Sequence, residues 1–369
     1  MRILGTHGVP ANYGGFETAA ENVGLFLARQ GWRVVVYCQV EGAGPIREDV
    51  WRGMERVLIP VDLEGWRGTS KFDLISIRHA ARYDDVCLTF GYNTAIFNIV
   101  QRAKRIPLVI NMDGIEWSRE RWGKARQAIL YVNERIACVV GNHLIADHPE
   151  IEVYLSRKAP KRKISMVTYG AHAVAAAPVE AVEKFGLTPG KYATVICRPI
   201  PENSILELVQ GFSAKPRGRQ LAVLGAYTPD TDPYHRQVME AASDEVVFLG
   251  PVYEPSIVQA LRFHSFVYLH GHTVGGTNPS LVEAMAAGNP VIAYDNPFNR
   301  WTAGDAAVYS RGAEDVSLLL GELLADPDRL QAMSAAARAR HAAEFTWEHI
   351  AGQYEQILWR YAAAPVSAR

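Results

Sequence analysis

The chain has 369 residues, of which 49% are hydrophobic and 21% are charged, and its formal net charge is -1. This balance is typical of a soluble globular protein, and the length fits two domains better than one core. Because a chain near neutrality has no global positive field, we expect no nucleic-acid partner.

Strand-like runs and helical patterns alternate over the first half of the sequence. Residues 2–6 predict a first strand, and a glycine-containing loop joins it to a helix at 16–30 that stops at Gly31. Further strands are predicted at 33–38, 85–89, 108–111, 138–140 and 163–167. Apolar, β-branched strands that alternate with helices favour a parallel sheet covered on both faces.

From 172 to 191 this pattern lapses into Ala, Pro, Val, Glu and Gly, which predicts a link between domains. The alternation then resumes, with strands at 192–197, 220–224, 246–249, 266–270 and 290–293 and helices at 204–212, 255–263 and 280–287. The tail predicts an amphipathic helix that returns to the first domain. We therefore predict two Rossmann-like domains facing across a cleft, an N-terminal one of 1–172 with 346–369 and a C-terminal one of 190–345.

The cysteine pattern and the first residues bear on the compartment. The four cysteines are widely separated and form no CxxC pair, so we expect buried thiols rather than zinc or redox sites. The start of the sequence lacks the features of a signal peptide, and no apolar run reaches the roughly 18 residues of a membrane span. These features predict a cytoplasmic protein.

The strongest motif runs from Gly271 to Gly288, at the end of a predicted strand. Its loop residues are Gly275, Gly276, Thr277 and Asn278. Asn278 and Pro279 are typical of an N-cap and a first helical residue, so loop N–H groups and the helix start predict a site for a diphosphate. Glu283, one turn into the helix, could accept hydrogen bonds from ribose hydroxyls. An ordinary strand–loop–helix unit with a solvated glutamate explains the pattern equally well.

Two other predicted strand ends carry candidate donor-binding residues. Arg198 could bind a phosphate through two hydrogen bonds, although a surface arginine would have the same pattern. Gly14 and Gly15 lead into the first helix and would let backbone amides approach a phosphate or a sugar. Their spacing is not GxGxxG, and the second strand lacks the ribose-binding acid at its end, so we do not expect NAD binding.

Together these motifs resemble the GT-B glycosyltransferases of the large retaining family 4, over nearly the whole chain. Arg198 falls on the phosphate-binding arginine of that family, and Glu283 on the second glutamate of its E-x7-E motif. Residues 249–253, which include Val252, resemble the strand end near the nucleobase. Residues 345–348 resemble the start of its closing helix. Segments 5–8, 13–17, 111–117 and 275–280 are similar to a rhamnosyltransferase-like subgroup that builds bacterial capsule, O-antigen or exopolysaccharide.

The resemblance implies a retaining enzyme that moves a hexosyl or deoxyhexosyl group, with rhamnose favoured. The donor would be a dTDP-, UDP- or GDP-sugar, and the acceptor a glycan or a polyprenyl-diphosphate-linked glycan at the inner face of the cytoplasmic membrane. No cofactor or metal is expected, since His270 with His272 is more typical of a polar loop than of a ligand pair. In two departures, Gly275 replaces the first glutamate of E-x7-E and Asn203 replaces a lysine. Arg198, backbone amides and the helix end would then stabilise the leaving group.

The first half contains the candidates for the acceptor. Asp113 follows an apolar strand and could meet the acceptor hydroxyl, although Asp-Gly turn chemistry explains it equally well. His7 and Glu17, beside the glycine loop, are weaker candidates. Segment 117–126 mixes indole and basic side chains, among them Arg119, Arg121 and Lys124. It predicts either a solvated helix or docking to an anionic membrane or lipid diphosphate.

Two other functions fit the same motifs, because a fold does not fix a function. A sugar-nucleotide epimerase or hydrolase would use the diphosphate site without an acceptor surface. A catalytically silent partner in polysaccharide assembly would be compatible with the departures at Gly275 and Asn203.

Overall fold

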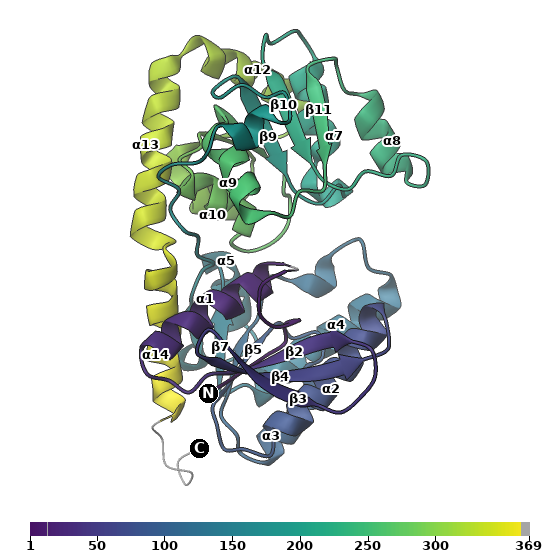
Figure 1. The fold of residues 1–369 in the computed structure, drawn as a ribbon, viewed down its shortest axis with the longest axis vertical. Coiled ribbons are helices and arrows are strands. Elements are labelled where there is room, and N and C mark those ends of the chain that lie inside the picture. The colour runs from purple at the N-terminus through teal and green to yellow at the C-terminus, as the bar shows by residue number, and fades with distance from the viewer. Residues whose placement is uncertain (13, 363–369) are drawn as a thin grey trace. The chain divides into compact units, whose positions relative to one another are not determined.

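The structure, a computed structural model, describes residues 1–12 and 14–362. The chain forms two compact units, one of Met1–Tyr169 with the C-terminal helix and one of Gly170–Thr346. Each unit contains a largely parallel sheet packed against helices (Figure 1). The predicted class, an α/β chain with two successive parallel-sheet halves, is therefore confirmed.

The sheet of the first unit has eight described strands in the order β3-β4-β2-β1-β5-β6-β7-β8. Their bounds are β1 Arg2–Leu4, β2 Val35–Glu41, β3 Arg47–Trp51, β4 Met54–Val61, β5 Cys87–Phe90, β6 Leu108–Asn111, β7 His143–Ala146 and β8 Ile164–Met166. All neighbouring pairs are parallel except β3 and β4, which form an antiparallel hairpin at one edge. The side chains of β1, β5 and β6 are buried almost throughout, as a covered parallel sheet requires.

The helices of the first unit are α1 Gly15–Arg29, α2 Gly65–Ala80, α3 Ile99–Ala103, α4 Lys124–Val140, α5 Pro149–Ser156 and α14 Trp347–Ala362. Three short 3-10 turns, η1 Ala95–Asn98, η2 Glu116–Ser118 and η3 Lys161–Lys163, lie between them. Helix α14 buries Ile350, Tyr354 and Ile357 and packs against α1, where the rings of Trp32 and Trp359 lie 4.5 Å apart (Figure 1). The predicted return of the C-terminal helix to the first domain is thus confirmed.

The second unit has six described strands in the order β11-β10-β9-β12-β13-β14, all parallel. Their bounds are β9 Tyr192–Ile196, β10 Gln220–Leu224, β11 Val246–Gly250, β12 Val267–His270, β13 Val291–Tyr294 and β14 Ala307–Ser310. The helices are α6 Glu180–Glu183, α7 Ile205–Ser213, α8 Pro233–Glu240, α9 Pro255–Phe263, α10 Pro279–Ala286, α11 Pro297–Ala303, α12 Ala313–Ala325 and α13 Pro327–Glu344, with 3-10 turns η4 Pro201–Asn203 and η5 Gly304–Ala306. The strand order reverses beside β9 and β12, the point where such sheets bind ligands.

Two sequence-based assignments differ from the structure. The predicted strand at 138–140 is wrong, because these residues form the last turn of α4, and the strand is β7. Cys138 and Val140 are apolar because they lie on the buried side of the helix, not because they are extended, whereas Val139 between them is exposed. In the predicted link at 172–191, Val182 and Leu187 pack into the second unit against Leu261.

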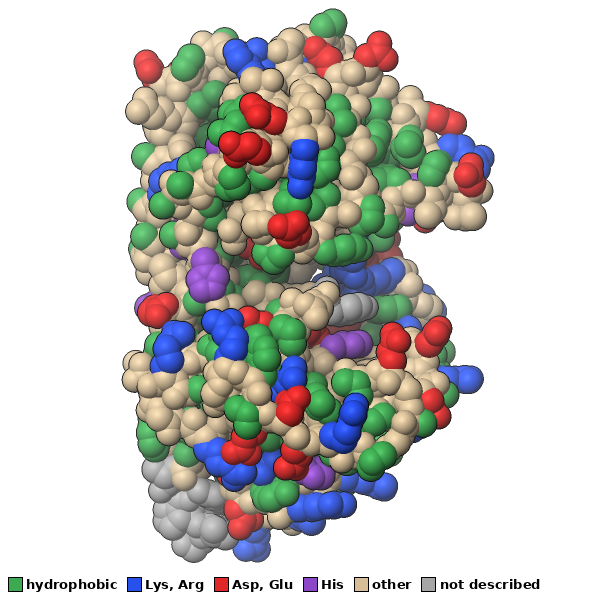
Figure 2. Space-filling view, viewed as in Figure 1, with side chains coloured by type: hydrophobic (Ala, Val, Ile, Leu, Met, Phe, Trp, Pro, Cys, Tyr) green, Lys and Arg blue, Asp and Glu red, His purple; other side chains and the backbone are tan. Residues whose placement is uncertain are grey.

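Charged side chains of both signs are interspersed on the face drawn in Figure 2. This distribution agrees with the formal net charge of -1 and offers no broad positive field there. None of the helices described in 1–12 and 14–362 combines the length and apolar character needed to cross a membrane.

Candidate functional site

In the second unit, the loop after β9 presents Arg198 to solvent and holds its backbone in place. The carbonyl of Arg198 accepts hydrogen bonds from Asn203 Nδ2 at 2.8 Å and from the Ile200 N–H at 2.9 Å. Asn203 itself is buried, so its side chain positions this loop instead of reaching solvent. The guanidinium is thus exposed on a backbone that its neighbours restrain.

The loop after β12 is joined directly to the loop after β9. The N–H and the hydroxyl of Thr273 each donate to the Glu202 carbonyl, both at 3.0 Å. Gly271 packs so closely that a Cβ there would lie 2.2 Å from the Asn203 carbonyl oxygen. The structure therefore brings the Arg198 loop and the Gly271–Asn278 loop together at the carboxyl edge of the sheet.

Helix α10 begins as the sequence predicts, with Asn278 as N-cap and Pro279 as first residue. Asn278 Oδ1 accepts from the Ser280 N–H at 3.0 Å, and the Ser280 hydroxyl donates to the Ile196 carbonyl at 3.1 Å. The second bond anchors the helix start to the end of β9. Because the cap occupies the Ser280 N–H and proline has none, the predicted anion site depends on the loop N–H groups.

The loop before α10 supplies the unoccupied donors. The N–H groups of Gly275, Gly276 and Asn278 have no acceptor among the residues that the structure describes. Gly275 has φ +134°, a conformation open to glycine and costly for other residues. This backbone explains in physical terms why a glutamate does not stand at position 275. Thr277 is buried, only 3% exposed.

Glu283 has a charged partner that the sequence did not reveal. Arg262 on α9 is buried, and its Nη2 lies 2.7 Å from Glu283 Oε2. The Glu283 side chain remains 35% exposed, so one carboxylate oxygen can be held while the other stays accessible. Arg262 lies between the apolar residues Leu261 and Phe263 of α9, and no local sequence pattern predicts the direction of its side chain.

The end of β11 carries the remaining donor-side candidate, Val252. Gly250 ends the strand at φ +71°, and Val252 is half-buried against the cluster that contains Leu224 and Ile257. Its neighbour Tyr253 is 82% exposed. This edge therefore presents an apolar residue and an aromatic ring next to β10 and β9.

His270 and His272 form a stacked pair at the end of β12. Their ring centroids are 4.3 Å apart with planes 9° from parallel, and burial lowers the pKa of His270 well below its ordinary value. Asn296 and Asn299 both donate to the His272 carbonyl at 3.0 Å. Within residues 1–12 and 14–362, no group of three or more His, Cys, Asp or Glu side chains could hold a metal ion.

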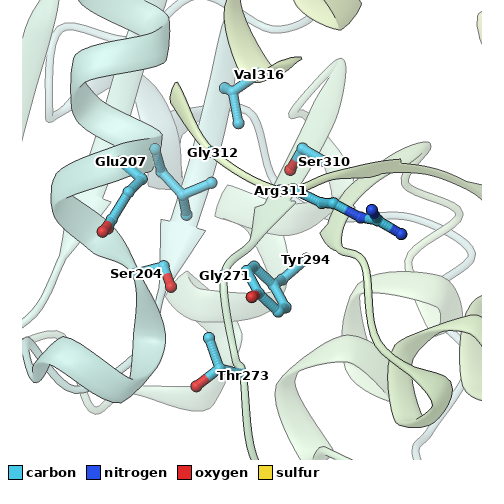
Figure 3. Close-up of a pocket in the computed structure, with 10 residues that line it drawn as sticks. Ser204, Glu207, Gly271, Thr273, Tyr294, Ser310, Arg311, Gly312 and Val316 are labelled. Carbon is cyan, nitrogen blue, oxygen red and sulfur yellow. The ribbon is translucent and has the colours of Figure 1, made fainter. Parts of the chain in front are cut away.

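A pocket of about 250 Å³ opens next to these loops (Figure 3). Hydroxyl groups of Ser204, Thr273 and Tyr294 line it together with the carboxylate of Glu207. Arg311 borders the pocket, but its side chain is largely exposed and binds Asp295. The lining is suited to a polar, hydroxylated ligand.

In the first unit, Gly14 and Gly15 form the start of α1, whose N-cap makes no side-chain hydrogen bond. Glu17 is buried and accepts from the His7 N–H at 2.8 Å. Glu21 accepts from the Ala11 N–H at the same distance. The Glu17 carboxylate therefore holds the glycine-containing loop in its conformation.

Asp113 follows β6 at φ +54°, a left-handed conformation that is uncommon for a non-glycine residue. Its N–H donates to Asn111 Oδ1 at 3.0 Å, and Asn111 Nδ2 donates to the Tyr354 hydroxyl at 2.6 Å. Burial, with a smaller contribution from the nearby Glu116 charge, raises the pKa of Asp113 above its ordinary value. Strained residues with perturbed pKa values are concentrated at functional sites.

Segment 117–126 is a regular, exposed helix only over its last three residues, where α4 begins. The buried carboxylate of Glu116 accepts hydrogen bonds from Arg121 and from Trp122 and pairs with Arg119. The chain forms a 3-10 turn here, and a regular helix begins only at Lys124. The expectation of a solvated helix is therefore wrong for 117–123, where Arg119 and Arg121 pair with Glu116, and agrees with the structure for 124–126.

The structure assigns the candidates to separate groups. Arg198, Asn203, Gly275, Gly276, Thr277, Asn278 and Glu283 lie in or beside the joined loops of the second unit. Val252 lies at the end of β11 in the same sheet. Gly14, Gly15 and Asp113 belong to the first unit, at the carboxyl edge of its sheet.

Comparison with models of protein families gives two separate matched segments along the chain. Residues 1–172 match a domain of unknown function, and residues 205–356 match the glycosyl transferase-like family. A GDP-mannose-dependent phosphatidylinositol monomannoside mannosyltransferase of Corynebacterium glutamicum is 30% identical over 166 residues. That match covers 42% of this chain and 43% of the relative, so the chain spans less than half the length of the relative it matches.

Solved structures resemble the chain over nearly its full length. Sucrose-phosphate synthase from Thermosynechococcus elongatus has a TM-score of 0.80 at 19% identity and covers 98% of this chain and 99% of its own. HepE of Anabaena, in complex with UDP-glucose, gives 0.75 at 15% identity, covering 98% and 100%. WaaG, a glycosyltransferase of lipopolysaccharide biosynthesis, gives 0.74 at 13% identity, covering 97% and 99%. The chain as a whole therefore shares the two-domain α/β fold of these solved structures, and its residues 205–356 match the glycosyl transferase-like family.

Proposed function

We propose that the protein transfers a sugar from a nucleotide diphosphate donor to a glycan acceptor. The observation that carries this proposal is the junction of two loops at one strand edge of the second unit. It joins the loop of the exposed residue Arg198 to the loop that carries the unoccupied N–H groups of Gly275 and Gly276. Such donors, preorganised for anionic oxygen, are what a diphosphate leaving group requires.

The donor would lie along that edge. The diphosphate would contact Arg198 and the loop amides, and the ribose would bond to the free oxygen of Glu283 while Arg262 holds the other. The nucleobase would lie near Val252. The UDP-glucose complex of the structurally similar HepE supports a nucleotide sugar as the ligand class.

Breaking the glycosidic bond leaves negative charge on the diphosphate, which Arg198 and the Gly275–Gly276 amides would stabilise. The raised pKa of Asp113 brings this carboxyl closer to neutrality, as suits a group that exchanges a proton with an acceptor hydroxyl. The proposed mechanism uses neither a metal nor a cofactor.

Finer features of the proposal come from the family resemblance. They are a retaining outcome, a hexosyl or deoxyhexosyl donor with dTDP-rhamnose favoured over UDP- and GDP-sugars, and a place in cell-surface polysaccharide synthesis. The acceptor would be a glycan or a polyprenyl-diphosphate-linked glycan. The protein would then work in the cytoplasm, with peripheral contact to the inner face of the membrane.

A thermal-shift screen with dTDP-, UDP- and GDP-sugars tests donor binding, because a ligand that binds only the native state raises its apparent stability. We expect one nucleotide class to raise the Tm in the wild type and to do so less in Arg198→Ala. Incubation with that donor alone then distinguishes transfer from the two rival functions. Rapid epimerisation or hydrolysis favours the epimerase or hydrolase, and binding without transfer to any acceptor favours the silent partner.

A further inference from the structure

Helix α4 exposes a line of apolar side chains, which we call the α4 stripe. Its members Ile129, Val132 and Val139 are 59%, 54% and 69% exposed. Their spacing places them on one side of the helix over about 15 Å. The opposite side, with Leu130, Ala137 and Cys138, is buried in the first unit. The stripe is therefore not needed for the internal packing of α4.

The apolar surface continues onto the neighbouring turn η1 and helix α3. Ile96 and Ile99 are each 45% exposed, and Val100 is 37% exposed. The Ile96 N–H donates to Asn133 Oδ1 of α4 at 2.9 Å, which fixes η1 against α4. Single exposed apolar residues are ordinary, whereas a contiguous group on two packed elements marks a contact surface.

The charged side chains that these two helices expose have one sign. The exposed charged side chains of α3, its two following residues and α4 are all basic: Arg102, Lys104, Arg105, Lys124, Arg126 and Arg135. The single acidic residue of α4, Glu134, is buried and bound to Lys158 and Tyr154. A local basic surface thus exists on a chain whose formal net charge is -1.

We infer that the α4 stripe and these basic side chains dock on an anionic lipid bilayer. Apolar side chains flanked by Lys and Arg are the composition of helices that lie in a membrane interface, and the basic groups complement anionic headgroups. This inference rests on the membrane contact in the proposed function but not on sugar transfer. It shares Lys124 and Arg126 with segment 117–126, but not that segment's Arg119 and Arg121, which are paired with Glu116.

The test is cosedimentation of the full chain with two kinds of vesicle, one of phosphatidylcholine and one that also contains phosphatidylglycerol. We expect the wild type to bind the anionic vesicles and to bind less at high salt. The variant Ile129→Gln/Val132→Gln/Val139→Gln should lose about tenfold or more in partitioning. Arg102→Gln/Arg135→Gln should lose about tenfold, mainly at low salt.

A matched control changes three exposed apolar side chains elsewhere, Val50→Gln/Leu63→Gln/Leu318→Gln, and should bind like the wild type. Circular dichroism and melting curves establish that every variant is folded. Equal partitioning of the stripe variant and the wild type overturns the inference, as does no wild-type binding to anionic vesicles. A wild-type dimer that the stripe variant turns into a monomer, without lipid binding, assigns the surface to a second copy instead.

Transfer to a water-soluble acceptor keeps this test separate from the test of the proposed function. The stripe variant should retain that transfer, since α4 carries none of the proposed donor-binding residues. If vesicle binding is found but no transfer, the docking surface stands and the proposed function fails. If transfer is found but no vesicle binding, the proposed transfer stands and the docking surface fails.

Discussion

The two units share an architecture but differ in the carboxylates that they bury. Among the described residues, the fully buried acidic side chains are Glu17, Asp73, Glu116 and Glu134, all in the first unit. The buried ionisable side chains of the second unit are Arg262, His235, His270 and His341. The unit with the candidate diphosphate site therefore buries no described carboxylate that would repel an anion, while the unit with the acceptor candidate contains several.

Most of the buried carboxylates have strong donors. Glu17 accepts a backbone N–H, Glu116 binds two arginines, and Glu134 binds Lys158. Asp73 differs, because its described hydrogen bond comes from the Thr94 hydroxyl at 2.7 Å. The comparison thus predicts that anion binding resides in the second unit and that much of the pH dependence of stability resides in the first.

The largest expected effect is that of Arg198→Ala on catalysis. Removing one preorganised donor to a developing charge lowers turnover by about 10²–10³. Because the side chain is exposed and its loop is held through backbone atoms, the Tm should stay near that of the wild type. Steady-state kinetics with the nucleotide sugar found in the thermal-shift screen provide the measurement.

Two further variants make this result specific. Arg198→Lys keeps the positive charge but cannot form the bidentate hydrogen bonds of a guanidinium, so it should retain part of the activity. Arg329→Ala removes an arginine paired with Glu322 on the surface of the same unit and should have no effect. Near-normal turnover by Arg198→Ala would remove the main catalytic assignment.

The next effect concerns stability and the buried carboxyl of Asp73. Burial raises its pKa from 3.8 to about 6. Because the folded pKa exceeds the unfolded one, the favourable contribution of the protonated carboxyl is complete below pH ~3.8 and is lost as the pH rises through ~6. Asp73→Asn should therefore be more stable than the wild type at pH 7–8, by about 1–3 kcal/mol.

Denaturant unfolding of both proteins between pH 4 and 8 gives the test. The difference in unfolding free energy should shrink towards zero as the pH falls to about 4. Asp328→Asn, an exposed aspartate at the start of α13, is the control and should not change this profile. A constant difference at all pH values would contradict the assignment to Asp73.

Local patterns predicted the parts of the site that depend on neighbouring residues in the sequence. The cap at Asn278 and the loop glycines are of this kind, and so is the alternation that gives two α/β units. The pairing of Arg262 with Glu283 spans 21 positions, so no local pattern contains it. The prediction of a strand at 138–140 was wrong for a related reason. A short apolar run is compatible with a buried helix end as well as with a strand.

The smallest expected effect, at Gly275, tests whether this position lacks a glutamate because of its backbone. A Cβ at Gly275 would meet no atom within 4 Å, so Gly275→Ala adds conformational strain without a clash. At φ +134° that strain costs about 1–3 kcal/mol and should weaken donor binding by roughly tenfold, as measured by calorimetric titration. Gly275→Glu should bind no better than Gly275→Ala, since its carboxylate would bring negative charge towards the diphosphate. If Gly275→Glu instead binds the donor more tightly than the wild type, the loop can adopt a conformation that accommodates a glutamate, and the donor site is less fixed than its hydrogen bonds imply.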